Sequence, residues 1–170
     1  DGFGLTLELL ATDVERGLAL VHELITDSTF PADELELQRQ LVLSELRARD
    51  DDIFDVSSRL LQRTLFTRHP YRFDVLGSRE SVERIGRETC RAFGAEWLVP
   101  SNIVLAVFGD VDEERLMADI ERRFGRLPKH TAPWPGTLTE ASVDGFREAS
   151  LVVPKEQSLV LVGFHKRSVR

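Results

Sequence analysis

Apolar residues recur at two different periods along this chain, and the change of period constrains its fold more than any single motif. Alternate residues are apolar from Phe3 to Leu9, and residues 103–108 form an unbroken apolar run. Both patterns are typical of β-strands, as are the segments 146–153 and 159–164. Between them, apolar residues three or four positions apart predict amphipathic helices. We expect these helices over residues 14–27, 31–49, 53–66, 87–97 and 113–124, with a short one after Ser78.

Polar residues mark where the predicted helices begin. Thr12 and Glu15 are a predicted capping box, in which each side chain accepts a hydrogen bond from the other residue's backbone N–H. The predicted N-caps of three later helices are Asp52, Ser78 and Asp112. We also expect Gly125 to follow the end of the last helix.

Composition narrows the possible functions. The 170 residues carry 22 Lys and Arg against 29 Asp and Glu, which gives a net charge of −7. Domains that bind nucleic acids are normally basic, so we expect no nucleic-acid partner. No apolar run approaches the roughly 20 residues of a membrane-spanning helix, so no membrane span is predicted. The single cysteine, Cys90, excludes an internal disulfide and a cysteine-based zinc site.

The two ends of the sequence lead us to expect a fragment. The alternating apolar pattern is already under way in the first residues, and the apolar segment Ser158–His165 stops close to the last residue. We therefore expect a chain truncated within structure at its N-terminus. A strand separated from its neighbours exposes unpaired backbone groups, so we also expect homo-oligomers formed through strand edges.

The helix predicted over residues 31–49 contains the most informative pair of side chains. Gln38 and Glu45 are seven residues apart, so they differ by only about 20° around the helix axis and project side by side. Leucine and valine side chains flank the pair, which predicts that both polar residues are enclosed within the apolar sector. The flanking residues are Leu35, Leu41, Val42 and Leu46.

An ionised carboxylate that faces an apolar core needs a partner, because its desolvation is costly. For Glu45 the sequence leaves three partners open: a metal ion, an arginine such as Arg39 or Arg49, or water.

Other candidate motifs are weaker. His22-Glu23 resembles the start of a helical zinc motif, but position 26 is Thr rather than the second His that the motif needs. We expect a packed turn at His69-Pro70-Tyr71. The acidic run 50–52 lacks the ligand spacing of a calcium loop, so helix capping is the better interpretation. Cys90 falls within a helical pattern and is predicted to be an inert core residue.

An ordered set of segments resembles the M16 metallopeptidases, the family of pitrilysin, insulin-degrading enzyme and mitochondrial processing peptidase. The set begins with Ser28-Thr29-Phe30-Pro31 and the helix from Glu34 to Glu45. It continues with His69-Pro70-Tyr71, then with Leu76-Gly77-Ser78-Arg79-Glu80-Ser81-Val82, then with the segment from Pro100 to Asp112, and ends at Phe124-Gly125. No piece is specific alone, but their order covers residues 3 to about 127.

The resemblance implies an α+β fold, with a two-layer antiparallel sheet backed by helices. It also implies a division into residues 1–127, the C-terminal part of one M16-like unit, residues 128–145, a linker, and residues 146–170, the first strands of a following unit. The linker assignment agrees with the proline and glycine content of residues 129–145.

For the site, the resemblance implies zinc in the intact parent protein and none in the isolated fragment. Active members bind zinc through an upstream His-x-x-Glu-His and a glutamate on a later helix, which falls on Glu45. No His-x-x-Glu-His occurs in these 170 residues, so we expect no catalytic residue within the fragment. Active members usually carry a glutamate seven residues before the ligand, which supports it. This chain has the neutral Gln38 there, which the resemblance implies would support Glu45 by hydrogen bonding.

Two functions follow from the resemblance. The first is a fragment of a zinc-dependent endopeptidase that hydrolyses peptides or proteins and is inactive alone. The second is a non-catalytic M16-like half or subunit that helps to enclose a peptide or acts as a scaffold. The compartment, cytoplasmic or periplasmic in a bacterial-like protein, stays open.

Overall fold

The structure is a computed structural model that describes residues 3–133, 136, 138–140 and 145–165. The chain divides into two compact units, each formed by two stretches of sequence. Unit 1 consists of Asp1–Pro31 and Gly86–Trp134, and unit 2 of Ala32–Ile85 and Pro135–Arg170.

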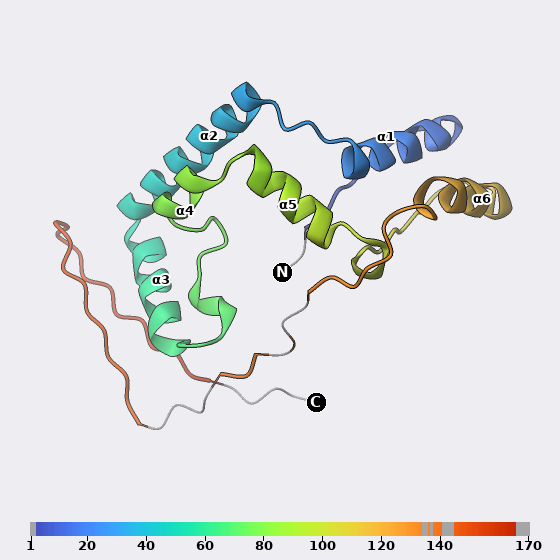
Figure 1. Ribbon diagram of the computed structural model, residues 1–170. Coiled ribbons are helices and arrows are strands. Elements are labelled where there is room, and N and C mark those ends of the chain that lie inside the picture. The colour runs from blue at the N-terminus through green and yellow to red at the C-terminus, as the bar shows by residue number, and fades with distance from the viewer. Residues whose placement is uncertain (1–2, 134–135, 137, 141–144, 166–170) are drawn as a thin grey trace. The chain divides into compact units, whose positions relative to one another are not determined.

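Helices account for the regular structure of both units (Figure 1). Unit 1 contains α1 (Val14–Thr26), α5 (Arg87–Trp97) and α6 (Glu113–Phe124), with the 3-10 turns η1 (Ala11–Asp13) and η3 (Pro100–Asn102). Unit 2 contains α2 (Ala32–Asp51), α3 (Ile53–Leu65) and α4 (Arg79–Arg84), with the 3-10 turn η2 (Pro70–Arg72). The helices expected from apolar spacing are therefore confirmed: α5 and α6 have the expected ends, and the ends of α1, α2 and α3 differ by at most two residues. None of the described helices is long and apolar enough to cross a membrane.

In unit 1, α1 packs against α6. Arg115 Nη2 lies 2.7 Å from Glu15 Oε1 at one end of this contact. At the other end the His22 and Phe124 rings meet edge to face, with centroids 5.6 Å apart. His22 therefore packs at the edge of a core, as expected of a histidine that belongs to no metal motif.

In unit 2, α2 packs against α3 and α4. A small core is formed by Leu43, Leu46 and Val82, with Val42 and Leu76 packed against it. Arg39 ties the end of α4 to α2, because its Nη1 donates to the carbonyls of Val82 at 2.6 Å and Glu83 at 3.1 Å. The core thus covers one face of α2 only.

Most of the predicted helix starts are confirmed. Asp52 accepts hydrogen bonds from the N–H groups of Phe54 and Asp55, Ser78 accepts one from Ser81, and Asp112 accepts one from Arg115. The predicted capping box of Thr12 and Glu15 is wrong. Residues 11–13 form a 3-10 turn before α1, which makes Asp13 the N-cap, and this residue makes no side-chain capping bond.

The expected α+β fold, a two-layer antiparallel sheet backed by helices, is wrong for this chain. No residue in the described ranges forms a β-strand, although the segments 3–9, 103–108, 146–153 and 159–164 are strand-like in sequence. A helix satisfies its backbone hydrogen bonds internally, whereas a strand needs a neighbouring strand. The strand-like segments pair with no neighbour here, and large side chains on them stay exposed, for example Val104 at 94%.

The predicted division into residues 1–127, 128–145 and 146–170 stays a prediction. Parts of the predicted opening strand (1–2), of the predicted linker (134–135, 137, 141–144) and of the last segment (166–170) lie outside the described residues.

Candidate functional site

The candidate metal ligand Glu45 lies on α2, which begins directly after Pro31 and has two acidic residues in its first turn. The side of α2 that packs into unit 2 carries Leu43 and Leu46, which are 4% and 5% exposed. Arg39 and Arg49 on the same side are half-buried. This face is fixed by the apolar core and does not include Glu45.

Gln38 and Glu45 are exposed, not enclosed by apolar side chains as their spacing predicted. They do share one side of α2, because residues seven apart nearly coincide around the axis. Their apolar neighbour Leu41 is also uncovered, at 56% exposed. The apolar sector of α2 is therefore wider than the surface that α3 and α4 cover, and an apolar neighbour in sequence does not guarantee burial.

The two arginines considered as partners of Glu45 bind other groups. Arg39 pairs with Glu36 at 2.8 Å, and the hydrogen bonds from Gln40 and Arg39 lower the pKa of Glu36. Arg49 pairs with Asp55 at 3.0 Å and with Asp74 at 2.9 Å. Among the residues that the structure describes, Glu45 makes no ion pair and no hydrogen bond through its side chain.

No group of three or more His, Cys, Asp or Glu residues that could hold a metal ion occurs within the described part of the chain. A catalytic zinc needs three protein ligands and a water. The described residues therefore do not fit a complete zinc site, and Glu45 stands as one isolated carboxylate.

The turn His69-Pro70-Tyr71 was predicted to be packed, but only His69 is half-buried, whereas Pro70 and Tyr71 are exposed. His69 caps η2, because its Nδ1 accepts a hydrogen bond from the Tyr71 N–H at 3.2 Å. Its ring lies 4.3 Å from the Tyr71 ring and 5.7 Å from the Phe66 ring, centroid to centroid.

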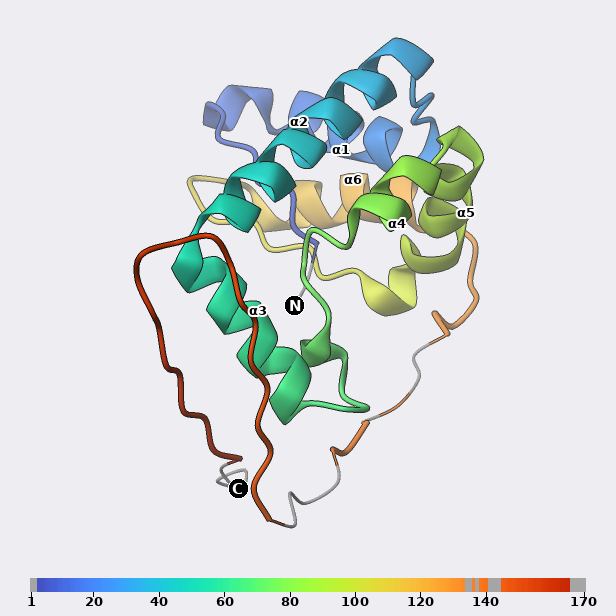
Figure 2. The same ribbon diagram turned by 90° about the vertical axis from the view of Figure 1, so that its left-hand side faces the viewer.

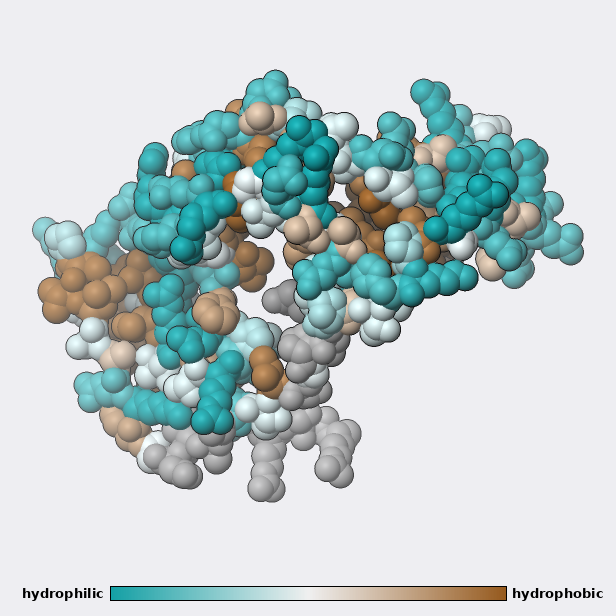
Figure 3. All heavy atoms as spheres, in the orientation of Figure 1, coloured by the Kyte–Doolittle hydropathy of each residue, from teal (hydrophilic) through white to brown (hydrophobic). Residues whose placement is uncertain are grey.

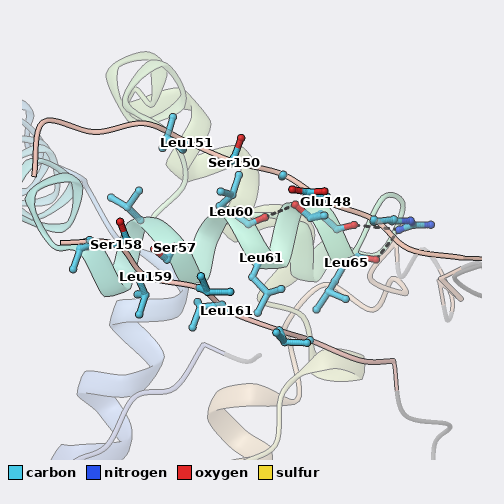
Figure 4. Close-up of a pocket in the computed structure, with 18 of the residues that line it drawn as sticks. Ser57, Leu60, Leu61, Leu65, Glu148, Ser150, Leu151, Ser158, Leu159 and Leu161 are labelled. Carbon is cyan, nitrogen blue, oxygen red and sulfur yellow. Dashed lines mark hydrogen bonds between the residues drawn. The ribbon is translucent and has the colours of Figure 1, made fainter. Parts of the chain in front are cut away.

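A groove runs along α3 in unit 2, with a volume of about 940 Å³. Figure 2 shows the extended chain after residue 145 passing along α3 and returning. Figure 4 shows Leu60, Leu61 and Leu65 of α3 together with Leu151 and Leu159 of the extended segments. Hydrophobic residues also remain open at the surface, drawn in brown in Figure 3.

Sequence reasoning missed the two charged residues that contact the end of α3, Glu140 and Arg147. Glu140 lies in the predicted linker, and its contacts are made more than 70 residues away along the chain. No local pattern signals such a contact.

Comparison with known proteins identifies the class. A family model described as "Peptidase M16 inactive domain" matches residues 84–169, about half of the chain. An uncharacterised zinc protease of Mycobacterium leprae is 31% identical over 91% of this chain and 35% of its own length. The chain thus belongs to the M16 peptidase family and spans about a third of the length of that relative.

Two solved structures are similar in fold. A protease from Helicobacter pylori superposes with a TM-score of 0.69 and 23% identity, over 80% of this chain and 33% of its own. A peptidase M16 inactive domain from Pseudomonas fluorescens superposes with a TM-score of 0.62 and 26% identity, over 75% of this chain and 30% of its own. The family resemblance expected from the ordered motifs is confirmed.

Proposed function

We propose that this chain is part of a zinc-dependent metalloendopeptidase that hydrolyses peptides or proteins, and that it is not catalytically competent alone. Membership of the M16 family and the zinc-protease names of its relatives support the first part. The lack of a His-x-x-Glu-His segment in these 170 residues supports the second.

Glu45 is the metal ligand that we propose this chain contributes to the parent, with Gln38 beside it as a hydrogen-bonding support. The place of Glu45 in the ordered M16-like segments carries this proposal, and its exposed carboxylate is available to bind an ion. Glu45 is exposed, and the neighbouring arginines Arg39 and Arg49 are engaged elsewhere. The other ligands must come from residues outside the described ranges.

Titration of this chain with zinc in a calorimeter tests the second part of the proposal. One carboxylate does not hold a catalytic zinc, so we expect no micromolar binding. Micromolar binding that disappears in Glu45→Ala, and persists in the control Glu34→Ala on the first turn of α2, contradicts the proposal that the chain lacks a complete site.

A second candidate function is a non-catalytic M16-like half or subunit that encloses a peptide or acts as a scaffold. Two observations favour it: the family model that matches residues 84–169 is described as inactive, and Gln38 is neutral. Loss of a supporting contact beside a metal ligand typically weakens metal binding or activity by roughly 10–100-fold.

The gene sequence upstream of Asp1 separates the two functions. A His-x-x-Glu-His segment there supports the peptidase, and a reading frame without one supports the scaffold. In either case the proposed partner of the parent is a peptide or protein.

A further inference from the structure

Two charged side chains bind opposite kinds of backbone group at the end of α3. Glu140 accepts hydrogen bonds from the N–H groups of Thr67 at 2.9 Å, Arg68 at 2.8 Å and His69 at 2.8 Å. The Thr67 hydroxyl donates to the same carboxylate at 2.6 Å. These donors follow the last turn of α3 and precede η2, so neither helix uses them.

Arg147 binds backbone acceptors in the last turn of α3. Its Nη1 donates to the carbonyl of Thr64 at 3.2 Å and to that of Leu65 at 3.0 Å. The last carbonyls of a helix lack intrahelical partners and carry partial negative charge, so a guanidinium is well placed there. The negative Glu140 thus binds backbone donors, and the positive Arg147 binds backbone acceptors.

The chain after Arg147 lies along the apolar side of α3. Gly163 lies close to α3, because a Cβ at this position would lie 2.6 Å from Leu65 Cδ1 and 3.1 Å from Leu61 Cδ1. Figure 4 shows both leucines between the two extended segments. No strand ladder holds the described part of these segments, so other contacts must hold them on the helix.

We propose that Glu140 and Arg147 form a two-point clamp that holds residues 145–165 against α3. Glu140 fixes the chain on one side of residues 141–144, and Arg147 fixes it on the other. The clamp sets the direction in which the extended segments leave the turn, and thereby forms the groove. It depends on contacts within unit 2 and is independent of zinc binding.

The test uses two NMR readouts on the whole chain. The first is the amide hydrogen-exchange rate of residues 67–69, and the second is the nuclear Overhauser contact between the Leu65 methyls and the Gly163 Hα. The variants are Glu140→Gln and Arg147→Met. The matched control is Arg72→Met, which removes a 2.6 Å hydrogen bond to the carbonyl of Thr67. Arg72 makes no hydrogen bond or ion pair with the described residues 140 and 145–165.

If Glu140 and Arg147 act together, replacing either residue also weakens the contacts that depend on the other. We expect Arg147→Met to speed amide exchange at residues 67–69, which it does not touch, and Glu140→Gln to speed it by about tenfold. Both variants should lose the contact between Leu65 and Gly163, whereas Arg72→Met keeps it. Arg147→Lys, which retains a cationic donor, should recover most of the contact.

Two results would overturn the proposal. One is wild-type exchange at residues 67–69 in Arg147→Met, which makes the two residues independent caps. The other is an intact contact between Leu65 and Gly163 in either variant. A helical circular dichroism spectrum of each variant checks that it is folded. If Arg147→Met unfolds, the contact between Leu65 and Gly163 in Glu140→Gln gives the answer, because Glu140 touches neither residue.

Discussion

At the scale of single residues, Asp74 is a buried acidic group of unit 2 that needs partners to compensate for its burial. Its side chain is 5% exposed, and Oδ1 accepts hydrogen bonds from Arg49 and from the N–H of Leu76, both at 2.9 Å. Arg59 Nε lies 3.9 Å from Oδ2. Hydrogen bonding to Asp55 raises the pKa of the Arg49 guanidinium, so Arg49 stays charged and compensates the buried carboxylate.

We expect Arg49→Met to lower the free energy of unfolding by about 3 kcal/mol, because it leaves a buried carboxylate short of its main partner. The measurement is urea unfolding followed by circular dichroism. The control Arg91→Met removes a 3.6 Å pair with the exposed Glu88 and should cost less than about 1 kcal/mol. Equal losses in the two variants would show that the Asp74 contacts are not stabilising.

The lowered pKa of the Glu140 carboxyl predicts how the stability of the fold depends on pH. The hydrogen bonds from the Thr67 hydroxyl and from the N–H groups of residues 67–69 hold the pKa of this carboxyl far below its usual value of 4.5. A group whose pKa is lower in the folded state stabilises the fold above its unfolded pKa, and this contribution is lost as the pH falls. As the pH is lowered below 4.5, we therefore expect the urea midpoint of unfolding to decrease less steeply in Glu140→Gln than in the wild type. Identical slopes would mean that Glu140 is not held in solution.

At the scale of elements, the N-cap of α3 gives a prediction about how much a capping side chain stabilises the fold. Asp52 Oδ1 accepts hydrogen bonds from the N–H groups of Phe54 at 2.7 Å and Asp55 at 3.3 Å. Asp52→Ala should cost about 1 kcal/mol of unfolding free energy, whereas Asp51→Ala, one residue earlier, should cost much less. A similar loss in both variants would indicate a general effect of acidic charge instead of a cap.

Helices and their caps were predictable here because their signals are local. Asp52, Ser78 and Asp112 lie next to the backbone groups that they bind, so spacing alone identifies them. The strand predictions were wrong for the opposite reason, since a strand depends on a partner elsewhere in the chain. Thr12 failed because a 3-10 turn before α1 competed with the expected cap.

At the scale of the whole molecule, the exposed apolar segments predict self-association. Residues such as Phe3, Val104 and Phe164 are mostly exposed, and large apolar surfaces favour association. We expect the elution volume in size-exclusion chromatography to decrease as the protein concentration rises. A monomer over a wide concentration range would contradict this prediction.

The candidate site was predictable in part. The helix that carries Glu45 and its side-by-side placement with Gln38 follow from helical geometry, and the family from the ordered motifs. The exposure of Gln38 and Glu45 was not predictable, because it depends on which side of α2 the neighbouring elements cover. The core residues Leu43 and Leu46 mark the covered side. The contacts of Glu140 and Arg147 join segments far apart in sequence, which no local pattern reveals.

The zinc content of the proposed parent peptidase, expressed with this chain as one of its parts, tests the central claim most directly. Glu45→Gln should lower the bound zinc and the peptide hydrolysis together, while Glu34→Gln on the same helix leaves both unchanged. Wild-type zinc content and activity in Glu45→Gln would contradict the assignment of Glu45 as a metal ligand and leave the scaffold function in its place.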